Sequence, residues 1–284
     1  MVKQIRDLGA SVRARLRALA REKNQQFDLV LTRYVLERFL YRLSVSAYRE
    51  RFVLKGAMLM TTWFDDPHRP TRDVDLLGYG DPAPEPILTM FREICAISAE
   101  DGVSFNAGAL RIELIREELQ YGGVRLRTTA VLAGARISVV VDIGFGDAVE
   151  PGVEEIDLPV LLEFPAPHLR AYARETVVAE KFQAVVMLGR ANSRMKDLYD
   201  LWLLSKTYEF ADDRLPQAIA GTFQRRKTAI PERLIDGLSP AFGGRSQAST
   251  MVRVYQRPLD RGSVFGNRDR GPRRISHAER AESS

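Results

Sequence analysis

Two aspartates separated by a single residue, Asp73 and Asp75, are the first pattern in the sequence that could do chemistry. They open a short apolar segment, residues 72–78, that we expect to form a strand, and a strand places residues i and i+2 on the same face. Two carboxylates at that spacing repel each other, and aspartate is unfavourable within strands. A bridging divalent cation would explain the pair, because Mg²⁺ binds one or two carboxylates together with substrate phosphates. The alternative is that both aspartates are solvated at the end of a strand.

Asp142 is a third acidic residue at the end of a predicted strand, residues 136–143. One face of this strand carries only branched apolar residues: Ile137, Val139, Val141 and Ile143. Asp142 lies on the opposite face, because side chains alternate along a strand. An acid delivered by a separate strand suits a third metal ligand or a general base in phosphoryl transfer. The metal ligands that we predict are therefore Asp73, Asp75 and Asp142. The alternative for Asp142 is a hydrogen-bonded carboxylate at a strand end.

Lys181 and Asp200 are charged residues on the apolar sides of two predicted helices, at about 174–189 and 194–206. A lysine in an apolar stripe either extends its ammonium group to solvent or meets a buried anion. Asp200 follows Asp197 by three residues, so these acids could instead form surface pairs with Arg194 and Lys196. Spacing alone leaves both interpretations open.

Lys55 and Gly56 precede an apolar run, residues 57–64, that we expect to be a buried helix. Glycine lets backbone N–H groups approach a phosphate closely, and a helix N-terminus favours an anion. The pair is therefore a candidate for nucleotide binding. The three histidines are dispersed and do not resemble a zinc motif, and the single cysteine, Cys95, excludes a disulfide framework.

The elements that must position these residues fall into four regions. Residues 1–50 contain two predicted helices, the second at about 27–43. Residues 51–150 form an α/β core with a helix at about 86–99 and, besides the strand at 72–78, strands at 110–115, 124–131 and 136–143. Residues 151–242 are expected to be helical, at about 174–189, 194–206, 214–226 and 231–238. Residues 243–284 show no sustained periodicity and are expected to be an irregular, disordered tail. The fold class is therefore α/β (α+β).

The net charge of +5 does not mark the whole chain as a nucleic-acid binder. Nine arginines and four acids in residues 243–284 account for all of it, which leaves residues 1–242 neutral. A local excess of base remains in the first predicted helix, where arginines could contact RNA phosphates: Arg6, Arg13, Arg17 and Arg21. The alternative is the solvated face of an amphipathic helix. No apolar run reaches the length of a membrane span and residues 1–23 lack the apolar stretch of a secretory signal, so we expect a cytoplasmic protein.

Five segments in a fixed order resemble the AbiEii/AbiGii toxin family: RFVLKGAML, RPTRDVDLLG, VVVDIG, ETVVAEKF and RMKDLYDLW. This family contains nucleotidyltransferase-like toxins of type IV toxin–antitoxin and phage-defence systems, and it is related to the MenT toxins. The resemblance covers about residues 30–210 and is specific as a set, whereas any one segment would not be. It implies a nucleotidyltransferase fold, with a mixed β-sheet core flanked by helices and a C-terminal helical extension.

The resemblance also implies roles for individual residues. Asp73 and Asp75 would hold Mg²⁺ or Mn²⁺ against the phosphates of an NTP substrate, with Asp142 as the third core acid. Lys181 would contact the phosphates, and Asp200 matches the family's C-terminal catalytic aspartate. The nucleotide-cradling positions would be Lys55, Gly56, Thr71 and Arg72. The chain departs from the broader pattern at Ala57, where the superfamily has glycine or serine, which puts phosphate contacts at that position in doubt.

The implied partners are an NTP, an RNA acceptor at the 3′ end of tRNA, and a cognate winged-helix antitoxin encoded nearby, with no membrane. Three rival functions stay open on the sequence: a nucleotidyltransferase that modifies a small molecule or metabolite, a non-catalytic family member that binds GTP or a partner protein, and a glycosyltransferase of the Asp-x-Asp type. The combination of Lys181 and Asp200 argues against the glycosyltransferase.

Overall fold

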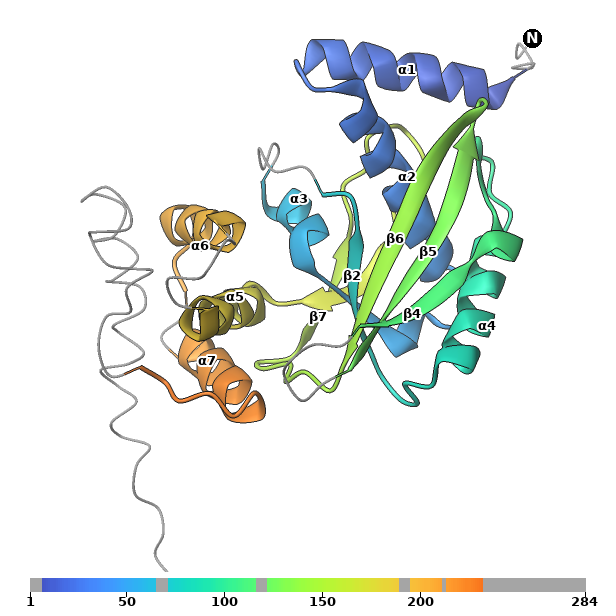
Figure 1. Ribbon diagram of the computed structural model, residues 1–284. Helices are drawn as coiled ribbons and strands as arrows, with labels where there is room; N and C mark the ends of the chain where they lie inside the picture. Colours follow the sequence, from blue (N-terminus) through green and yellow to red (C-terminus); the bar gives the residue numbers. More distant parts are fainter. Residues whose placement is uncertain (1–6, 65–70, 116–121, 189–194, 211–212, 232–284) are drawn as a thin grey trace, which may run out of the picture.

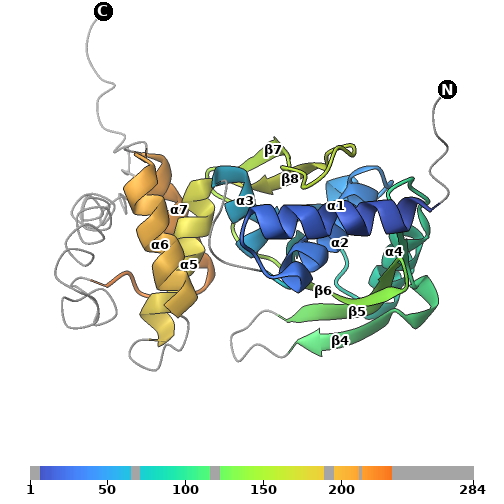
Figure 2. The same ribbon diagram turned by 90° about the horizontal axis from the view of Figure 1, so that it is seen from above.

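The computed structural model describes residues 7–64, 71–115, 122–188, 195–210 and 213–231. In these ranges the chain forms one mixed β-sheet with helices against it and three further helices at one end (Figures 1 and 2). The α/β class expected from the sequence is confirmed. The helix expected at about 231–238, the tail at 243–284 and Arg6 lie outside the described residues.

Two helices begin the described chain, as expected. α1 (Leu8–Glu22) starts at Asp7, whose Oδ1 accepts a hydrogen bond from the backbone N–H of Ala10 at 2.9 Å, as an N-cap residue does. The helix buries Val12, Leu16 and Ala20. α2 (Phe27–Ser44) is buried around most of its circumference and forms the centre of the core.

The sheet contains eight strands: β1 (Phe52–Lys55), β2 (Val74–Gly78), β3 (Val103–Phe105), β4 (Arg111–Ile115), β5 (Gly123–Leu132), β6 (Ala135–Phe145), β7 (Val153–Asp157) and β8 (His168–Tyr172). The order across the sheet is β3-β5-β6-β2-β1-β8-β7, and β4 also pairs with β5. The pairs β2–β6 and β1–β8 are parallel, and the other pairs are antiparallel. The strands that carry the predicted acids, β2 and β6, are therefore direct neighbours.

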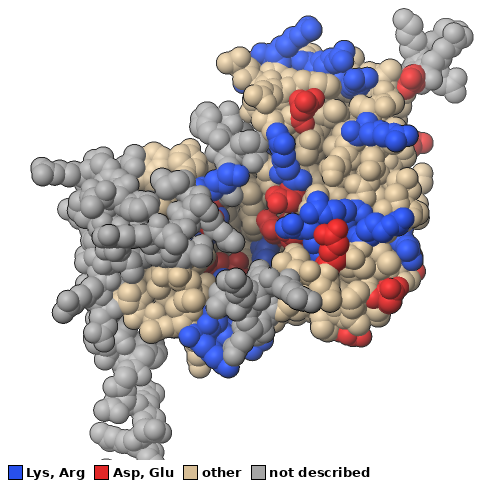
Figure 3. Space-filling model, in the orientation of Figure 1, with Lys and Arg blue, Asp and Glu red and all other residues tan. Residues whose placement is uncertain are grey.

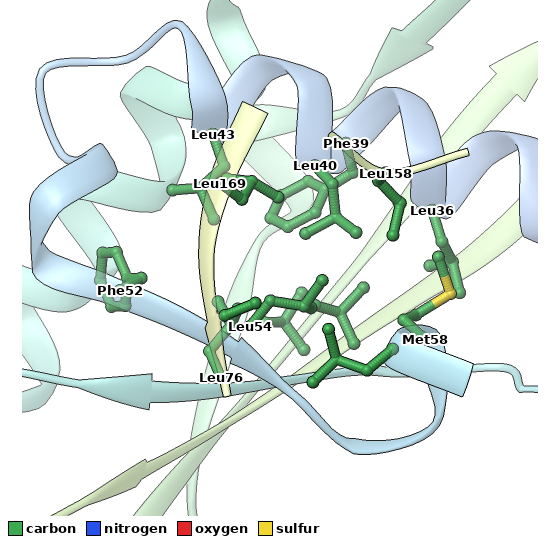
Figure 4. Close-up of a cluster of buried hydrophobic side chains, with 14 of the residues drawn as sticks. Leu36, Phe39, Leu40, Leu43, Phe52, Leu54, Met58, Leu76, Leu158 and Leu169 are labelled. Atoms are coloured by element: carbon green, nitrogen blue, oxygen red, sulfur yellow. The ribbon is translucent and has the colours of Figure 1, made fainter. Parts of the chain in front are cut away.

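The core lies between α2 and one face of the sheet. Figure 4 shows Leu36, Phe39, Leu40 and Leu43 of α2 together with strand residues such as Leu54, Leu76 and Leu169. Along β6 the apolar residues at 137, 139, 141 and 143 are all buried, as their alternation predicts. The positions between them, including Asp142, lie on the other face of the sheet.

Helices and 3₁₀ turns occupy the segments between the first strands. The apolar run at 57–64, expected as one helix, is divided into a 3₁₀ helix η2 (Gly56–Leu59) and a single turn α3 (Met60–Trp63). α4 (Pro84–Ala96) corresponds to the helix expected at about 86–99. Two further 3₁₀ turns, η1 (Arg49–Arg51) and η3 (Ala107–Ala109), complete the segments before β5.

Three helices follow the sheet: α5 (Arg174–Leu188), α6 (Met195–Thr207) and α7 (Arg214–Arg225). Their bounds nearly coincide with the expected ones, and α5 contacts both of the others. The sheet, however, continues through residue 172, beyond the expected core boundary at residue 150, because β7 and β8 add to its edge next to β1. No helix among the described residues has the length and apolar character that crossing a membrane would require.

Candidate active site

The register of the sheet places five charged residues in one row across five strands. Lys55 of β1 is paired with Asp75 of β2, Asp75 with Asp142 of β6, Asp142 with Arg125 of β5, and Arg125 with Glu113 of β4. Paired residues of neighbouring strands lie on the same face of a sheet. Two aspartates are thereby neighbours in the middle of the row, with a cationic residue on either side.

Asp75 occupies the most crowded position of the row. Burial, followed by the nearby Asp73 carboxylate, raises the pKa of Asp75 to about 6, and Asp142 acts in the same direction. The ammonium groups of Lys55 and Lys181 oppose this rise. Asp73 precedes β2 and accepts a hydrogen bond from Thr71 Oγ1 to its Oδ1 at 2.8 Å. The ionised form of Asp75 is therefore disfavoured mainly by burial and secondly by the neighbouring carboxylates.

Gly56 lies directly against the carboxylate of Asp75. Its backbone φ is +73°, a conformation that favours glycine, and a Cβ at this position would lie 1.9 Å from Oδ2 of Asp75. Any larger residue would have to displace the carboxylate. The structure therefore brings Gly56 together with Asp75, as expected for a turn that borders the site. Thr71 is half-buried beside Asp73, whereas Arg72 is exposed.

Arg125 binds both oxygens of Asp142. Its Nε donates to Oδ1 at 2.6 Å and its Nη2 donates to Oδ2 at 2.5 Å, which is the bidentate geometry of a strong arginine–carboxylate pair. Burial opposes the charge of Arg125 only weakly, and the hydrogen bonds to Asp142 raise its pKa. Sequence reasoning missed Arg125. The alternation of residues 124–131 was a usable signal, because it places Arg125 and Arg127 on the polar face.

Lys55 contacts two acids that the sequence did not indicate. Its Nζ lies 2.7 Å from Oδ2 of Asp147 and 3.7 Å from Oε1 of Glu180 on α5. Arg226 contacts the same two carboxylates at 3.0 and 2.9 Å. Burial alone would raise the pKa of Asp147, but Lys55 and Arg226 outweigh it and lower that pKa to about 2. This cluster connects the first strand of the sheet to the C-terminal helices.

Lys181 and Asp200, for which the sequence left two interpretations open, are brought together in the structure. Lys181 Nζ lies 2.7 Å from Oδ2 of Asp200 and 2.8 Å from Oδ1 of Asp197. Asp200 is fully buried. Because Lys181 also acts on Asp75 electrostatically, this pair of helices adjoins the row of charged residues on the sheet.

The donor chemistry of Asp73 and Asp75 fits a hard divalent cation. Asp73 and Asp75 offer carboxylate oxygens beside each other, and Mg²⁺ sites commonly use one or two carboxylates and substrate oxygens. The absence of a side chain on Gly56 leaves room for the Asp75 carboxylate. Across the described residues, no group of three acidic, histidine or cysteine side chains is arranged to hold a metal ion, and Asp142 is engaged by Arg125. The role of Asp142 as a third ligand stays a prediction.

The arginines of α1 lie at the far end of the β5–β6 hairpin. Arg13 donates from Nη1 to the backbone oxygen of Ala133 at 3.3 Å, and Arg17 lies over the ring of Phe27 at 5.2 Å. Arg13, Arg17 and Arg21 border a shallow pocket on α1. From Ala135 to Asp142 the strand advances seven residues, or about 23 Å. These arginines therefore do not adjoin the carboxylates.

A family profile and two solved structures are similar to the chain. A family profile, described as the nucleotidyl transferase AbiEii toxin of type IV toxin–antitoxin systems, matches residues 38–261. The match extends past residue 210, where the resemblance of the five segments ends. Among curated protein sequences, none matches the chain significantly.

Two solved structures from Helicobacter pylori are similar to the chain. The crystal structure of JHP933 has a TM-score of 0.48 and 17% sequence identity, and the match covers 83% of this chain and 95% of that one. A second H. pylori structure, assigned provisionally as a nucleotidyltransferase, has a TM-score of 0.46 and 17% identity, with 84% of this chain and 97% of that one covered.

Proposed function

The chain belongs to the nucleotidyl transferase AbiEii toxin family of type IV toxin–antitoxin systems, and we propose that it transfers a nucleoside monophosphate from an NTP to an RNA hydroxyl with the help of Mg²⁺ or Mn²⁺. The observation that supports this proposal best is the pairing of Asp75 with Asp142 in neighbouring parallel strands, with Asp73 close to Asp75. A cluster of carboxylates beside lysines suits the binding of metal–nucleotide complexes.

The three aspartates of the site have distinct roles in this proposal. Asp73 and Asp75 hold the cation, which when bound neutralises charge on the reacting phosphate. Asp142 orients the attacking hydroxyl and accepts its proton, once Arg125 has turned from its oxygens. The hydroxyl oxygen forms a bond to the α-phosphorus, the bond from that phosphorus to the bridging oxygen breaks, and pyrophosphate leaves. Positioning and electrostatic stabilisation supply most of the rate in such reactions.

The lysines supply positive charge next to the nucleotide phosphates. Lys181 is fixed by Asp197 and Asp200 at one edge of the site, and Asp200 contributes by holding the ammonium group there. Lys55 and Gly56 border Asp75 on the other side, and Thr71 and Arg72 lie just before Asp73. These residues form the proposed nucleotide-binding edge.

The acceptor that we propose is the 3′ end of tRNA. Arg13, Arg17 and Arg21 on α1 are candidates for contacts with its phosphates, since such contacts supply much of the affinity for nucleic acids. Both substrates are cytoplasmic, and the enzyme would act there, as part of a toxin–antitoxin and phage-defence system. A winged-helix antitoxin encoded nearby would be the partner that restrains it.

Two other functions are compatible with the same site. The acceptor could be a small molecule or metabolite, or the protein could bind GTP or a partner without catalysis. One experiment distinguishes the three functions. The pure protein is incubated with Mg²⁺ and each α-³²P-labelled NTP, once with total tRNA and once with a metabolite extract. Label on tRNA that is lost in Asp73→Ala supports the proposal. Label only in the metabolite fraction, or nucleotide binding without any transfer, contradicts it.

A further inference from the structure

The face of β4, β5 and β6 that carries Asp142 also carries arginines with no part in the proposed reaction. The register pairs Arg111 of β4 with Arg127 of β5, and alternation along β6 places Arg136 on the same face as Asp142. We call Arg111, Arg127 and Arg136 the arginine track. It begins one row from the carboxylates and runs towards the β5–β6 hairpin.

The arginine track is open to solvent. The side chain of Arg127 is 45% exposed, and Arg111 and Arg136 are exposed as well. Between them on the same face lie Thr129 and Ser138, of which Ser138 is exposed. The opposite face of the same strands is buried in the core, so the arginines are not needed to cover it.

Towards the β5–β6 hairpin, the charged side chains on this face are all basic. Its two acids, Glu113 and Asp142, both lie in the row of Arg125, and the charged residues nearer the hairpin are the arginines of the track. At the hairpin turn, Arg13 of α1 bonds to Ala133 and continues the basic surface. Figure 3 shows basic side chains over the sheet and, in separate patches, towards α1, with acidic side chains beside the patch over the sheet.

We propose that the arginine track binds the sugar–phosphate backbone of the RNA acceptor and leads its reactive end to Asp75 and Asp142. This inference rests on the proposed function and adds the surface on which the acceptor lies. The track joins two parts of the molecule that are otherwise about 23 Å apart along β6, the carboxylates and the arginines of α1. An acceptor held along this line contacts both at once.

The chemistry of the face favours RNA over an acidic protein partner. Protein interfaces concentrate their binding energy in buried aromatic and apolar anchors. The row between the arginines carries the hydroxyl groups of Thr129 and Ser138, and Val140 and Val131 lie opposite Arg127 and Arg136 in the adjoining rows. Hydroxyl groups together with arginines are common donors to phosphate oxygens. An exposed sheet face with arginines on either side of a row of hydroxyl groups therefore suits a phosphate backbone.

Charge reversal on the track tests the proposal in the full chain. Arg127→Glu and Arg136→Glu are compared with Arg92→Glu, which reverses an exposed arginine on α4. Binding of a fluorescein-labelled tRNA mixture is measured by anisotropy, without nucleotide, at several salt concentrations. Each track variant is expected to bind about tenfold more weakly than wild type, and to lower the slope of log K against log salt by about one. Arg92→Glu is expected to match wild type.

Steady-state kinetics separate the track from the reaction itself. The track variants should raise KM for tRNA and leave KM for the NTP unchanged, and thermal melts establish that each variant is folded. If both track variants bind tRNA as Arg92→Glu does, the track is not an RNA surface, and an acidic protein partner becomes the better assignment. If tRNA binding depends on the track but wild type transfers no nucleotide, the track stands and the proposed function fails.

Discussion

Asp75 of β2 and Asp142 of β6 are direct partners in two parallel strands of the sheet. Neither aspartate is next to a basic residue in the sequence. The two carboxylates are brought together by the fold alone. Lys55 and Arg125 occupy the next positions on either side of the pair. The two carboxylates are therefore at the centre of the row, where a cation and a nucleotide would bind. A basic residue lies next to them on each side.

Substituting Asp75 should stabilise the fold while abolishing transfer. Asp75→Asn removes a carboxylate whose ionised form is disfavoured by burial and by the neighbouring Asp73. With EDTA present at pH 8, we expect the free energy of unfolding to rise by roughly 3 kcal/mol. Urea unfolding measures this, with Asp213→Asn, an exposed aspartate at the start of α7, as the control. A less stable Asp75→Asn protein would contradict the crowding that we infer.

Alanine at Gly56 should be more harmful than alanine at another glycine of similar conformation. Gly56 and Gly134 have φ of +73° and +77°, but only at Gly56 would a Cβ meet Asp75. Both substitutions strain the backbone by about 1–2 kcal/mol. Gly56→Ala should lose stability beyond Gly134→Ala, and it alone should reduce nucleotide transfer at least about tenfold. Equal effects in thermal melts and in transfer assays would show that the contact with Asp75 is unimportant.

Removing the ammonium group of Lys181 should destabilise the helical extension. Lys181→Met takes away the cation that contacts Asp197 and the buried Asp200, and breaking such a pair typically costs about 3–5 kcal/mol. Lys196→Met removes an exposed lysine of the neighbouring helix and should change the free energy of unfolding by less than about 0.5 kcal/mol. Adding Asp200→Asn to Lys181→Met should restore part of the loss. Similar effects of the two lysine substitutions on the free energy of unfolding would contradict the role given to Lys181.

The free energy of unfolding should fall between about pH 5 and pH 8 because Glu37, which is buried on α2, loses its proton in this range. Its carboxylate accepts hydrogen bonds from Arg38 and from the backbone N–H of Leu161, but burial dominates and raises its pKa to about 7. The unfolded chain, with the usual pKa of about 4.5, loses this proton first as the pH rises. The folded state is therefore favoured at low pH, by roughly 3 kcal/mol from this group, and the advantage disappears above pH 7.

Glu37→Gln tests this pH dependence. The substitution cannot ionise, so the wild-type protein should lose more stability than the variant between pH 5 and pH 8, whatever the absolute stability of the variant. Urea unfolding at the two pH values gives the comparison. Identical pH dependence in both proteins would mean that Glu37 does not titrate in this range.

The sequence predicted most of the long elements because their periodicity is strong. The alternation of residues 136–143 placed Asp142 opposite the apolar face, and β6 has that arrangement. The strands β3, β7 and β8 were not expected, because they contain only three to five residues and polar positions such as His168 and Arg170 interrupt them. Short strands of this kind form because a neighbouring strand offers backbone N–H and C=O groups for hydrogen bonding. The local sequence does not show which strand will be the neighbour.

Part of the site could be predicted for the same reason, and part could not. Asp73 and Asp75 are two residues apart, so the sequence alone puts them close together, although Asp73 lies just before β2 and not within the expected strand. The partners of Lys55 come from distant segments, Asp147 and Glu180 at 2.7 and 3.7 Å. Arg125 meets Asp142 through the register of β5 and β6. Register is set by the whole sheet and its turns, so these contacts required the structure.

The most direct test of the central claim is transfer of α-³²P label from an NTP to tRNA by the wild-type protein and by Asp75→Asn. Intact tRNA is compared with tRNA whose 3′ ribose has been oxidised by periodate, and γ-³²P label serves as a control for phosphoryl transfer. We predict α-label on intact tRNA with wild type, and none with oxidised tRNA, with γ-label or with Asp75→Asn. Undiminished labelling by Asp75→Asn, or labelling from the γ-phosphate, would contradict nucleotidyl transfer at the carboxylate row.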